Sequence, residues 1–298
     1  MSPRNSIEFV LLAAIWGASF LCMRIAAPEL GPTSVALLRC AIGAVTLLCI
    51  FFAQGALPTF KDKLSGIALV GVVNSAIPFV LLGYASLSLS AGVTSILNSL
   101  APLWTAAIAF AWYKDRLSRL QVLGLILGTV GVVILVSGSG SATPALSMST
   151  VVLAFVAAVA ATAAYGFAAN IARGKLTGVN PLAVAAGSQV AATLALLGPG
   201  IATWPETTPT DARLWIAVLV LGVVCTGIAY LLFFRLIGSL GATRAVAVTY
   251  IIPVFGIAWG MLVLQEQLTP MIVLGAVIIV AGTALTTAFA ATRKRANP

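Results

Sequence analysis

Long apolar stretches, separated by short polar segments, recur along the whole chain. Each stretch approaches the roughly 20 residues that an α-helix needs to cross a bilayer. The pattern predicts ten spanning helices, at residues 7–27, 33–53, 64–84, 91–112, 120–137, 149–170, 181–202, 214–234, 242–264 and 271–290. The segments between them leave no room for a soluble domain, so the expected fold is all-α, a polytopic membrane protein.

Composition agrees with a membrane environment. Hydrophobic residues make up 61% of the 298 positions and charged residues only 8%, whereas soluble domains carry about 25% charged residues. The first stretch follows Arg4, as in a signal peptide, but it is long and has no small-x-small cleavage pattern before the second stretch. We therefore interpret it as a spanning helix.

The chain repeats itself at a nearly constant offset, which indicates an internal duplication. Pairs at this offset include Trp16 with Tyr165, Arg24 with Arg173, Pro102 with Pro253 and Asp115 with Glu266. The predicted units are a five-helix repeat at 1–137, a linker at 138–148 and a second five-helix repeat at 149–298, in one integral membrane unit. Because five is odd, the second repeat enters the membrane from the opposite side. Such inverted repeats are typical of alternating-access transporters.

The net charge of +9 raises the question of a nucleic-acid partner. Most of the 16 basic residues, however, fall in alternate connecting segments, and the segment 138–148 carries no charge. By the positive-inside rule this predicts cytoplasmic N- and C-termini in the plasma (cell inner) membrane. The expected partners are the lipid bilayer and a small-molecule substrate, with no nucleic acid, and the expected assembly is a monomer or homodimer.

Several kinds of chemistry are missing from the sequence. It has no histidine, no GxxxxGK[ST] phosphate-binding motif and no CxxC pair among its four cysteines. No carboxylate falls deep within a predicted span, so a membrane enzyme would lack its usual catalytic groups. We expect no enzymatic activity, no metal site and no cofactor.

The order of short motifs resembles a known family. The run at 15–20 (IWGASF), with Arg24, Pro32 and Arg39 after it, and the later run Ala101-Pro102-Leu103 with Asp115 and Gly124, resemble the EamA-type transporters of the drug/metabolite transporter superfamily. Asp115 stands where that family usually has Glu. The overall pattern is most similar to YddG-like amino-acid exporters. The resemblance implies a ten-helix transporter that exports small metabolites.

Candidate site residues are the few polar and aromatic side chains within spans, because such groups usually face the interior of a helix bundle. In the fourth span Thr94, Asn98, Pro102 and Thr105 recur every three or four positions, which predicts one shared face with Trp104 beside it. Prolines free backbone carbonyls and permit bending. The predicted substrate-binding residues are Trp16, Asn74, Tyr84, Thr94, Asn98, Trp104, Tyr165, Thr226, Tyr230 and Thr249, and the predicted hinges are Pro78, Pro102 and Pro253.

Charged residues in or near spans have several interpretations. Arg39, about two turns inside the second span, either binds a substrate carboxylate, reaches the interface or braces a helix end. Arg24 is close enough in sequence to pair with Glu29. Asp115 and Glu266 fall at span ends, where we expect caps or interface anchors.

Together these features predict a secondary transporter that exports small neutral metabolites by alternating access at a central cavity between the repeats. Amino acids, aromatic or otherwise apolar, are the expected substrates. The alternatives are a lipid or lipid-linked-sugar flippase of the same superfamily, an intramembrane enzyme and a passive channel. Since no carboxylate lies deep in a span, we expect no obligatory proton exchange. The alternative is that Glu8 carries a proton.

Overall fold

A computed structural model of the chain describes residues 1–54, 63–114, 117–139 and 147–296. Every regular element within these residues is helical. The elements are α1 (Pro3–Leu30), α2 (Pro32–Ala53), α3 (Leu64–Gly71), η2 (Val72–Ala76), α4 (Ile77–Ala85), α5 (Ala91–Asn98), α6 (Ala101–Tyr113), α7 (Arg119–Ser139), α8 (Met148–Lys175), α9 (Pro181–Ala202), α10 (Ala212–Leu219), η3 (Val220–Ile228), α11 (Ala229–Leu240), α12 (Ala242–Val246), η4 (Ala247–Tyr250), α13 (Ile252–Leu264) and α14 (Pro270–Ala296).

These elements form ten stretches that are long and apolar enough to cross a membrane. The prediction of an all-α, ten-span protein is confirmed. We number the stretches as spans 1 to 10. Spans 1, 2, 5, 6, 7 and 10 are the single helices α1, α2, α7, α8, α9 and α14, whereas spans 3, 4, 8 and 9 each combine several elements. Asp115 and residues 140–146 of the predicted linker lie outside the described residues.

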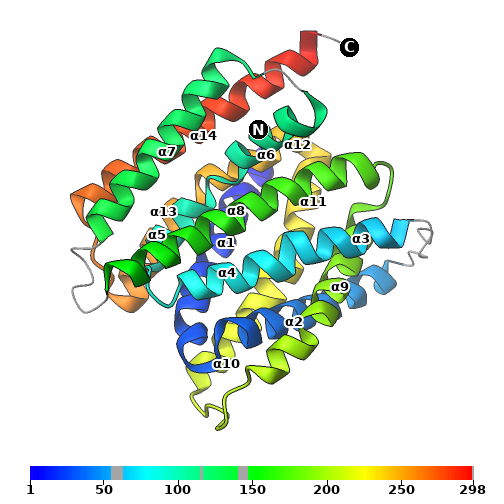
Figure 1. Cartoon of the computed structure of the whole chain (residues 1–298). Coiled ribbons are helices and arrows are strands. Elements are labelled where there is room, and N and C mark those ends of the chain that lie inside the picture. Colours follow the sequence, from blue (N-terminus) through cyan, green and yellow to red (C-terminus); the bar gives the residue numbers. More distant parts are fainter. Residues whose placement is uncertain (55–62, 115–116, 140–146, 297–298) are drawn as a thin grey trace.

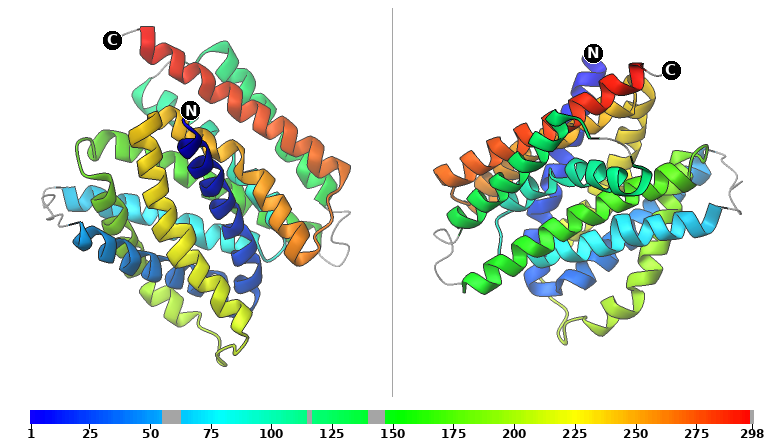
Figure 2. Two further views of the ribbon diagram at one scale, coloured as in Figure 1. Left: turned by 180° about the vertical axis from the view of Figure 1, so that it is seen from behind. Right: turned by 45° about the horizontal axis from the view of Figure 1, so that its top comes forward.

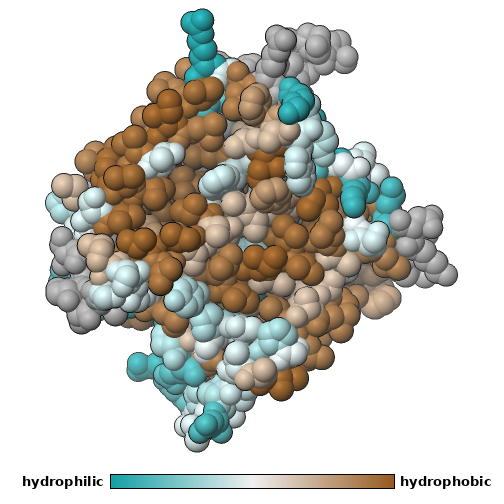
Figure 3. Space-filling view, in the orientation of Figure 1, coloured by the Kyte–Doolittle hydropathy of each residue, from teal (hydrophilic) through white to brown (hydrophobic). Residues whose placement is uncertain are grey.

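The outer surface is suited to lipid. Hydrophobic residues cover most of the face seen in Figure 3, and the more polar residues gather towards its rim. Large apolar side chains such as Val45, Leu194, Leu262 and Val277 are each more than 60% exposed. In water such a continuous apolar surface would be unfavourable, but in a bilayer it contacts acyl chains.

Helix contacts follow a symmetric pattern between the first half (1–137) and the second half (149–298). Span 1 packs on span 9 through α1 and α13, and span 6 packs on span 4 through α8 and α6. Span 2 packs on η3 of span 8, and span 7 packs on α3 of span 3. Span 2 also packs on span 7, and span 5 on span 10. Each of these contacts has a counterpart when the two halves are exchanged.

Irregular backbone occurs at equivalent places in both halves. The π-helix η2 in span 3 corresponds to the π-helix η3 in span 8. Span 4 breaks between α5 and α6, and span 9 breaks at η4 and Ile251. Lys114 and Gln265, which end α6 and α13, both have left-handed backbone, with φ of 56° and 55°. The breaks and the left-handed residues thus fall at matching positions in the two halves.

The predicted hinge prolines lie at these breaks. Pro102 and Pro253 are the second residues of α6 and α13, and Pro78 is the second residue of α4, directly after η2. A proline has no N–H, so the carbonyl four residues earlier loses its helical partner. The first turn of a helix tolerates this loss, and each proline thus starts a new helical segment within its span.

Helices α7 and α14 lie side by side along one edge of the molecule (Figures 1 and 2). Their backbones approach closely at glycines. A Cβ atom built on Gly282 would lie 2.7 Å from the carbonyl oxygen of Gly124, and one built on Gly275 would lie 2.7 Å from Leu135. Close packing of small residues is a common way to join helices in lipid. None of the described side chains of α7 and α14 lines the cavity described below.

Candidate functional site: a cavity between the two halves

A cavity of about 240 Å³ lies between the first and second halves. Aromatic and aliphatic side chains dominate its wall and a few polar groups converge on it, which is typical of a small-molecule site. The first half contributes Trp16, Ser19, Phe20, Met23, Arg39, Asn74, Phe79, Leu82, Asn98 and Ala101; the second contributes Tyr165, Cys225, Tyr230, Phe233, Thr249 and Ile252.

The structure brings many of the predicted site residues together on this wall. From the first half these are Trp16, Asn74 and Asn98, and from the second half Tyr165, Tyr230 and Thr249. Arg39 also lines the cavity. Asn98 and Thr249 occupy the equivalent breaks in spans 4 and 9, so the two halves do present polar groups at matching positions.

Four predicted residues do not line the cavity. Tyr84 and Trp104 are 43% and 36% exposed on the outer surface. Thr94 is buried, and its hydroxyl donates to the Ser90 carbonyl at 3.0 Å. Thr226 is buried behind the wall, where it donates to the Leu221 carbonyl at 2.9 Å.

The break in span 4 explains why Trp104 is not beside Asn98, whereas Thr94 lies one turn before Asn98 in the same helix α5 and is buried. The prediction of one shared face assumed a continuous helix, but α5 ends at Asn98 and α6 begins at Ala101. Ser99 and Leu100 form tight turns, with their N–H groups bonded three residues back. Helical spacing therefore does not carry across the break, and the shared face is wrong.

Hydrogen bonds and ring contacts join the two halves across the cavity. The Asn74 Nδ2 donates to the Tyr230 hydroxyl at 3.4 Å, which connects span 3 to span 8. The ring centroids of Trp16 and Phe233 lie 5.2 Å apart at an interplanar angle of 54°. Such tilted aromatic pairs stabilise a contact beyond the burial of their area.

Arg39 is the charged residue of the wall. Its side chain is only 6% exposed, so it does not reach the membrane interface. The guanidinium carbon lies 3.7 Å from the centroid of the Phe79 ring, and Nε donates to the Thr226 hydroxyl at 3.2 Å. Nη1 lies 3.8 Å from the Met23 sulfur. Thr226, predicted to bind substrate, therefore positions Arg39 instead of facing the cavity.

The other span arginine is used differently. Arg24 Nη1 donates to the carbonyls of Ser86 and Leu87, at 2.6 and 2.9 Å. The predicted pairing with Glu29 is wrong, because the side chain reaches the turn after α4 instead. Arg24 thus braces the end of span 3 and does not line the cavity.

Several wall residues escaped the sequence analysis because apolar side chains are common in every span. Phe79 and Phe233 are the clearest examples, since each stacks on a polar or aromatic partner of the wall. Phe20 ends the IWGASF run and Phe79 follows the hinge Pro78, so nearness to a motif was the available signal.

One end of the cavity is tightly packed; we call it the closed end. Here α5 packs on α13, and a Cβ atom on Gly92 would lie 3.0 Å from the Ile257 Cγ1. Glu266 bonds the first amides of α5 at this end. At the opposite end α12 packs on α11 and η4, and within the described part no comparable packing joins α12 to α6 or α8. The exchange symmetry of the two halves is therefore broken at the ends of the cavity.

The described residues contain no group of three or more His, Cys, Asp or Glu side chains that could hold a metal ion. Among these same residues, no acidic side chain lines the cavity. Three of the four cysteines are buried and Cys49 is exposed on the surface of α2. The wall thus offers binding groups, one cationic and the others neutral, without a catalytic constellation.

Comparisons with known proteins give one family. A model of the EamA-like transporter family matches residues 6–137 and 149–288. An uncharacterized transporter of Archaeoglobus fulgidus is 26% identical, with 93% of this chain and 96% of that protein covered. A probable amino-acid metabolite efflux pump of Salmonella typhimurium is 26% identical, with 95% and 94% covered. One crystal structure superposes over the full length of both chains with a TM-score of 0.66 at 18% identity, a likeness of fold.

Proposed function

This chain belongs to the EamA-like transporter family, and from that membership we propose that it exports small neutral amino acids by alternating access. Membership makes it a multi-pass membrane transporter and not an enzyme. The substrate, the direction and the mechanism are our proposals.

The observation that carries the mechanism is the cavity at the paired helix breaks. Asn98 and Thr249 line it from equivalent points in spans 4 and 9, next to Pro102 and Pro253. If the halves are inverted repeats, exchanging their conformations would open the opposite end of the cavity and close the present closed end. The broken symmetry between the two ends supports this exchange, because it is the asymmetry that one of two such states must have.

The size and chemistry of the cavity support an amino acid as substrate. Its volume of about 240 Å³ suits a small molecule. Rings such as Trp16 and Phe233 would contact an apolar side chain, while Arg39 and the amide groups of Asn74 and Asn98 would bind polar groups. The name of the Salmonella typhimurium relative points to the same substrate class.

The proposed orientation places both termini in the cytoplasm. The N-terminal end of α1 and the C-terminal end of α14 lie on the same side of the molecule (Figure 2). With the basic segments inside, the closed end would face outward and the opposite end the cytoplasm. The structure would then be the state that takes up substrate for export from the plasma membrane.

Counterflow in proteoliposomes tests the function. Purified protein is reconstituted into vesicles loaded with one unlabelled amino acid, and uptake of the labelled form is followed over a panel of amino acids. We expect saturable uptake of some apolar or aromatic members and none in protein-free vesicles. Uptake that stays linear in concentration would indicate a channel. Protein-dependent translocation of a fluorescent phospholipid, with no amino-acid counterflow, would support the flippase alternative.

A further inference from the structure

We infer that the cavity recognises its substrate as a dipole, with Arg39 binding a carboxylate and the acceptor oxygens of Asn98 binding an ammonium group. This inference rests on the proposed function and narrows it. The substrate would be an α-amino acid zwitterion with an apolar side chain, and simple organic amines would be excluded.

Arg39 is a buried cation, and no carboxylate of the described residues forms an ion pair with it. Its contacts are the Phe79 ring, the Thr226 hydroxyl and the Met23 sulfur, all of them neutral. An uncompensated charge removed from water is strongly unfavourable. These contacts orient the guanidinium but do not neutralise it, so a site for an anion is left on the cavity wall.

A carboxylate is the chemical group that matches this site. The planar guanidinium carries five N–H donors, and it pairs with carboxylates through two parallel hydrogen bonds. Phe79 covers one face of the guanidinium, Thr226 accepts from Nε and the Met23 sulfur accepts weakly from Nη1, so the N–H donors of Nη2 and the second one of Nη1 are left for a ligand. Any anion brought into the cavity therefore meets Arg39, the single cationic residue that the described part of the chain places on the wall.

Asn98 provides the opposite pole. Its Oδ1 is buried and has no hydrogen-bond donor within the described residues, which is unfavourable for a polar atom. Its backbone carbonyl is also deprived of the usual helical donor, because the residue four positions later is Pro102. A ligand with N–H donors would satisfy both oxygens. An ammonium group is such a ligand, and no carboxylate of the described wall competes for it.

The rest of the described wall carries no charge. Trp16 and Phe233 are apolar, while Asn74 and Thr249 are polar but neutral. A free amine would bring its charge into a cavity that already holds the Arg39 cation, and like charges at close range repel. A zwitterion adds no net charge and pairs the existing one, so the cavity should select it over the amine.

Three ligands that share one phenyl ring separate these contributions. L-phenylalanine carries both charges, 3-phenylpropionate only the carboxylate and phenethylamine only the ammonium. Binding to purified protein is measured by isothermal titration calorimetry, which does not require transport. We expect phenethylamine to bind at least about tenfold more weakly than either ligand with a carboxylate, since a hydrogen-bonded charge pair is lost.

Variants then assign the poles. Arg39→Gln should weaken the binding of 3-phenylpropionate about tenfold or more, and it should not weaken the binding of phenethylamine. Asn98→Asp should tighten the binding of phenethylamine, because a carboxylate would pair with the ammonium group. A variant that is only misfolded would not bind this ligand more tightly. Arg24→Gln is the matched control, because Arg24 bonds the Ser86 and Leu87 carbonyls outside the cavity. It should leave the ratio of the three affinities unchanged.

The outcomes distinguish this inference from the proposed function. Equal binding of amine and carboxylate, binding of no ligand to the wild type, or an Arg39→Gln variant that keeps its preference would overturn the inference. If Arg39→Gln does not fold, the inference is tested by the order of the three ligand affinities in the wild type and by the tighter binding of phenethylamine expected in Asn98→Asp. Carboxylate-selective binding without counterflow of any amino acid would refute export and leave the dipolar site standing.

Discussion

The Glu266 carboxylate accepts a hydrogen bond from the backbone N–H of Ala91 at 2.9 Å, although the two residues are 175 positions apart. Its second oxygen lies 3.5 Å from the N–H of Gly92. Gln265, with left-handed backbone, turns the chain at the end of α13 so that Glu266 reaches the N-terminus of α5. A carboxylate there satisfies orphan amides and interacts favourably with the helix dipole. Glu266 thus ties span 9 to span 4 at the closed end.

Removing this charge should loosen the closed end. A hydrogen bond to a charged group contributes about 1.5–3 kcal/mol, so Glu266→Gln should raise the population with free α5 amides roughly tenfold. Hydrogen–deuterium exchange of the peptide covering Ala91 to Val93 should quicken accordingly. Gln267→Ala, a change at an exposed neighbour, is the control and should exchange at the wild-type rate. Identical exchange in all three proteins would show that Glu266 does not hold this end.

The prediction for Glu266 shows how far the sequence alone reaches. Its place at the end of an apolar stretch predicted a cap or anchor, and the structure confirms a cap. Which helix it caps could not be predicted, because Ala91 is distant in sequence. The same limit made the pairing of Arg24 with Glu29 wrong. A neighbour in sequence was preferred to a carbonyl that only the packing of spans 1 and 3 brings close.

The fold was more predictable than the site, for a physical reason. Membrane spans depend on the hydropathy of about 20 residues together, so ten spans follow from composition along the chain. A cavity wall depends on the direction of single side chains. The break after Asn98 changes those directions without altering hydropathy, which is why Trp104 was misplaced. Asn98 and Thr249, at the paired breaks, were found because the predicted internal duplication pairs these two positions.

The prolines at the breaks should matter more for transport than for folding. Replacing Pro102 or Pro253 by Ala restores an N–H and removes a preference against helix interiors of about 3 kcal/mol, which favours a straight span. We expect counterflow to fall several-fold while the yield of folded protein is unchanged. Pro199→Ala, within α9 and away from the cavity, is the control. Wild-type turnover in both hinge variants would show that the breaks are not used for exchange.

Substitutions of the glycines between α7 and α14 should lower the stability of the fold and leave substrate binding unchanged. In Gly282→Val the new side chain would begin 2.7 Å from the Gly124 carbonyl oxygen and would force the helices apart. Such overpacking typically costs about 1–3 kcal/mol. We expect a lower melting temperature in detergent and an unchanged apparent affinity for substrate in the protein that folds. Gly238→Ala, where no atom lies within 4 Å of the added carbon, should melt at or above the wild-type temperature.

The proposed orientation is testable at the two ends of span 7. Thr177 and Thr207 are exposed in the turns that flank α9, on opposite ends of the helix. In a background with Cys49→Ala, an impermeant thiol reagent should label Thr207→Cys in intact cells. It should label Thr177→Cys only after the membrane is permeabilised. The reversed pattern would indicate the opposite orientation in the membrane. Labelling of both cysteines in intact cells would contradict a membrane-spanning α9.

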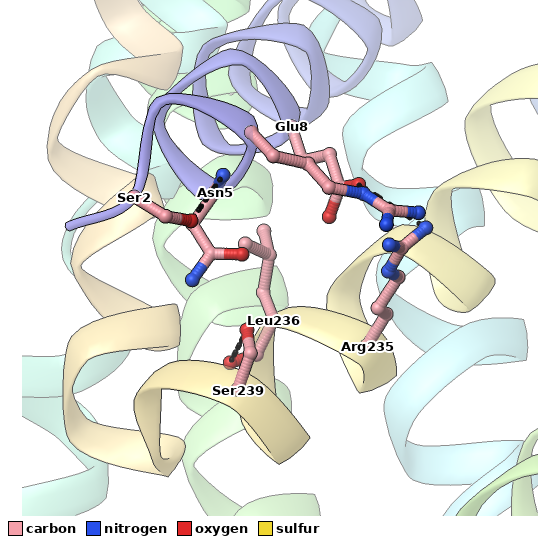
Figure 4. A network of polar contacts seen from close by, with 7 residues as sticks. Ser2, Asn5, Glu8, Arg235, Leu236 and Ser239 are labelled. Carbon is pink, nitrogen blue, oxygen red and sulfur yellow. Dashed lines mark hydrogen bonds and ion pairs between the residues drawn. The ribbon is translucent and has the colours of Figure 1, made fainter.

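Glu8 is the residue that the sequence analysis named as the alternative proton carrier. Glu8 Oε1 accepts from Arg4 Nε and Arg235 Nη1, each at 3.1 Å, near the N-terminal end of α1 (Figure 4). Its second oxygen is buried without a partner within the described residues. The ion pair with Arg235 joins span 1 to span 8. Glu8 therefore has a structural role away from the cavity wall.

We predict facilitated export down the gradient of the substrate, without obligatory proton exchange. Proton-coupled carriers generally keep a membrane Asp, Glu or His that binds the ion in one state and releases it in another. The chain has no histidine, and among the described carboxylates Glu266 caps a helix while Glu8 is paired with two arginines. In proteoliposomes at fixed membrane potential, an imposed pH gradient should not raise the internal substrate concentration above the external one. The Glu8→Gln variant should behave in the same way as the wild type. Gradient-driven accumulation that disappears in Glu8→Gln would identify Glu8 as the proton carrier and overturn this prediction.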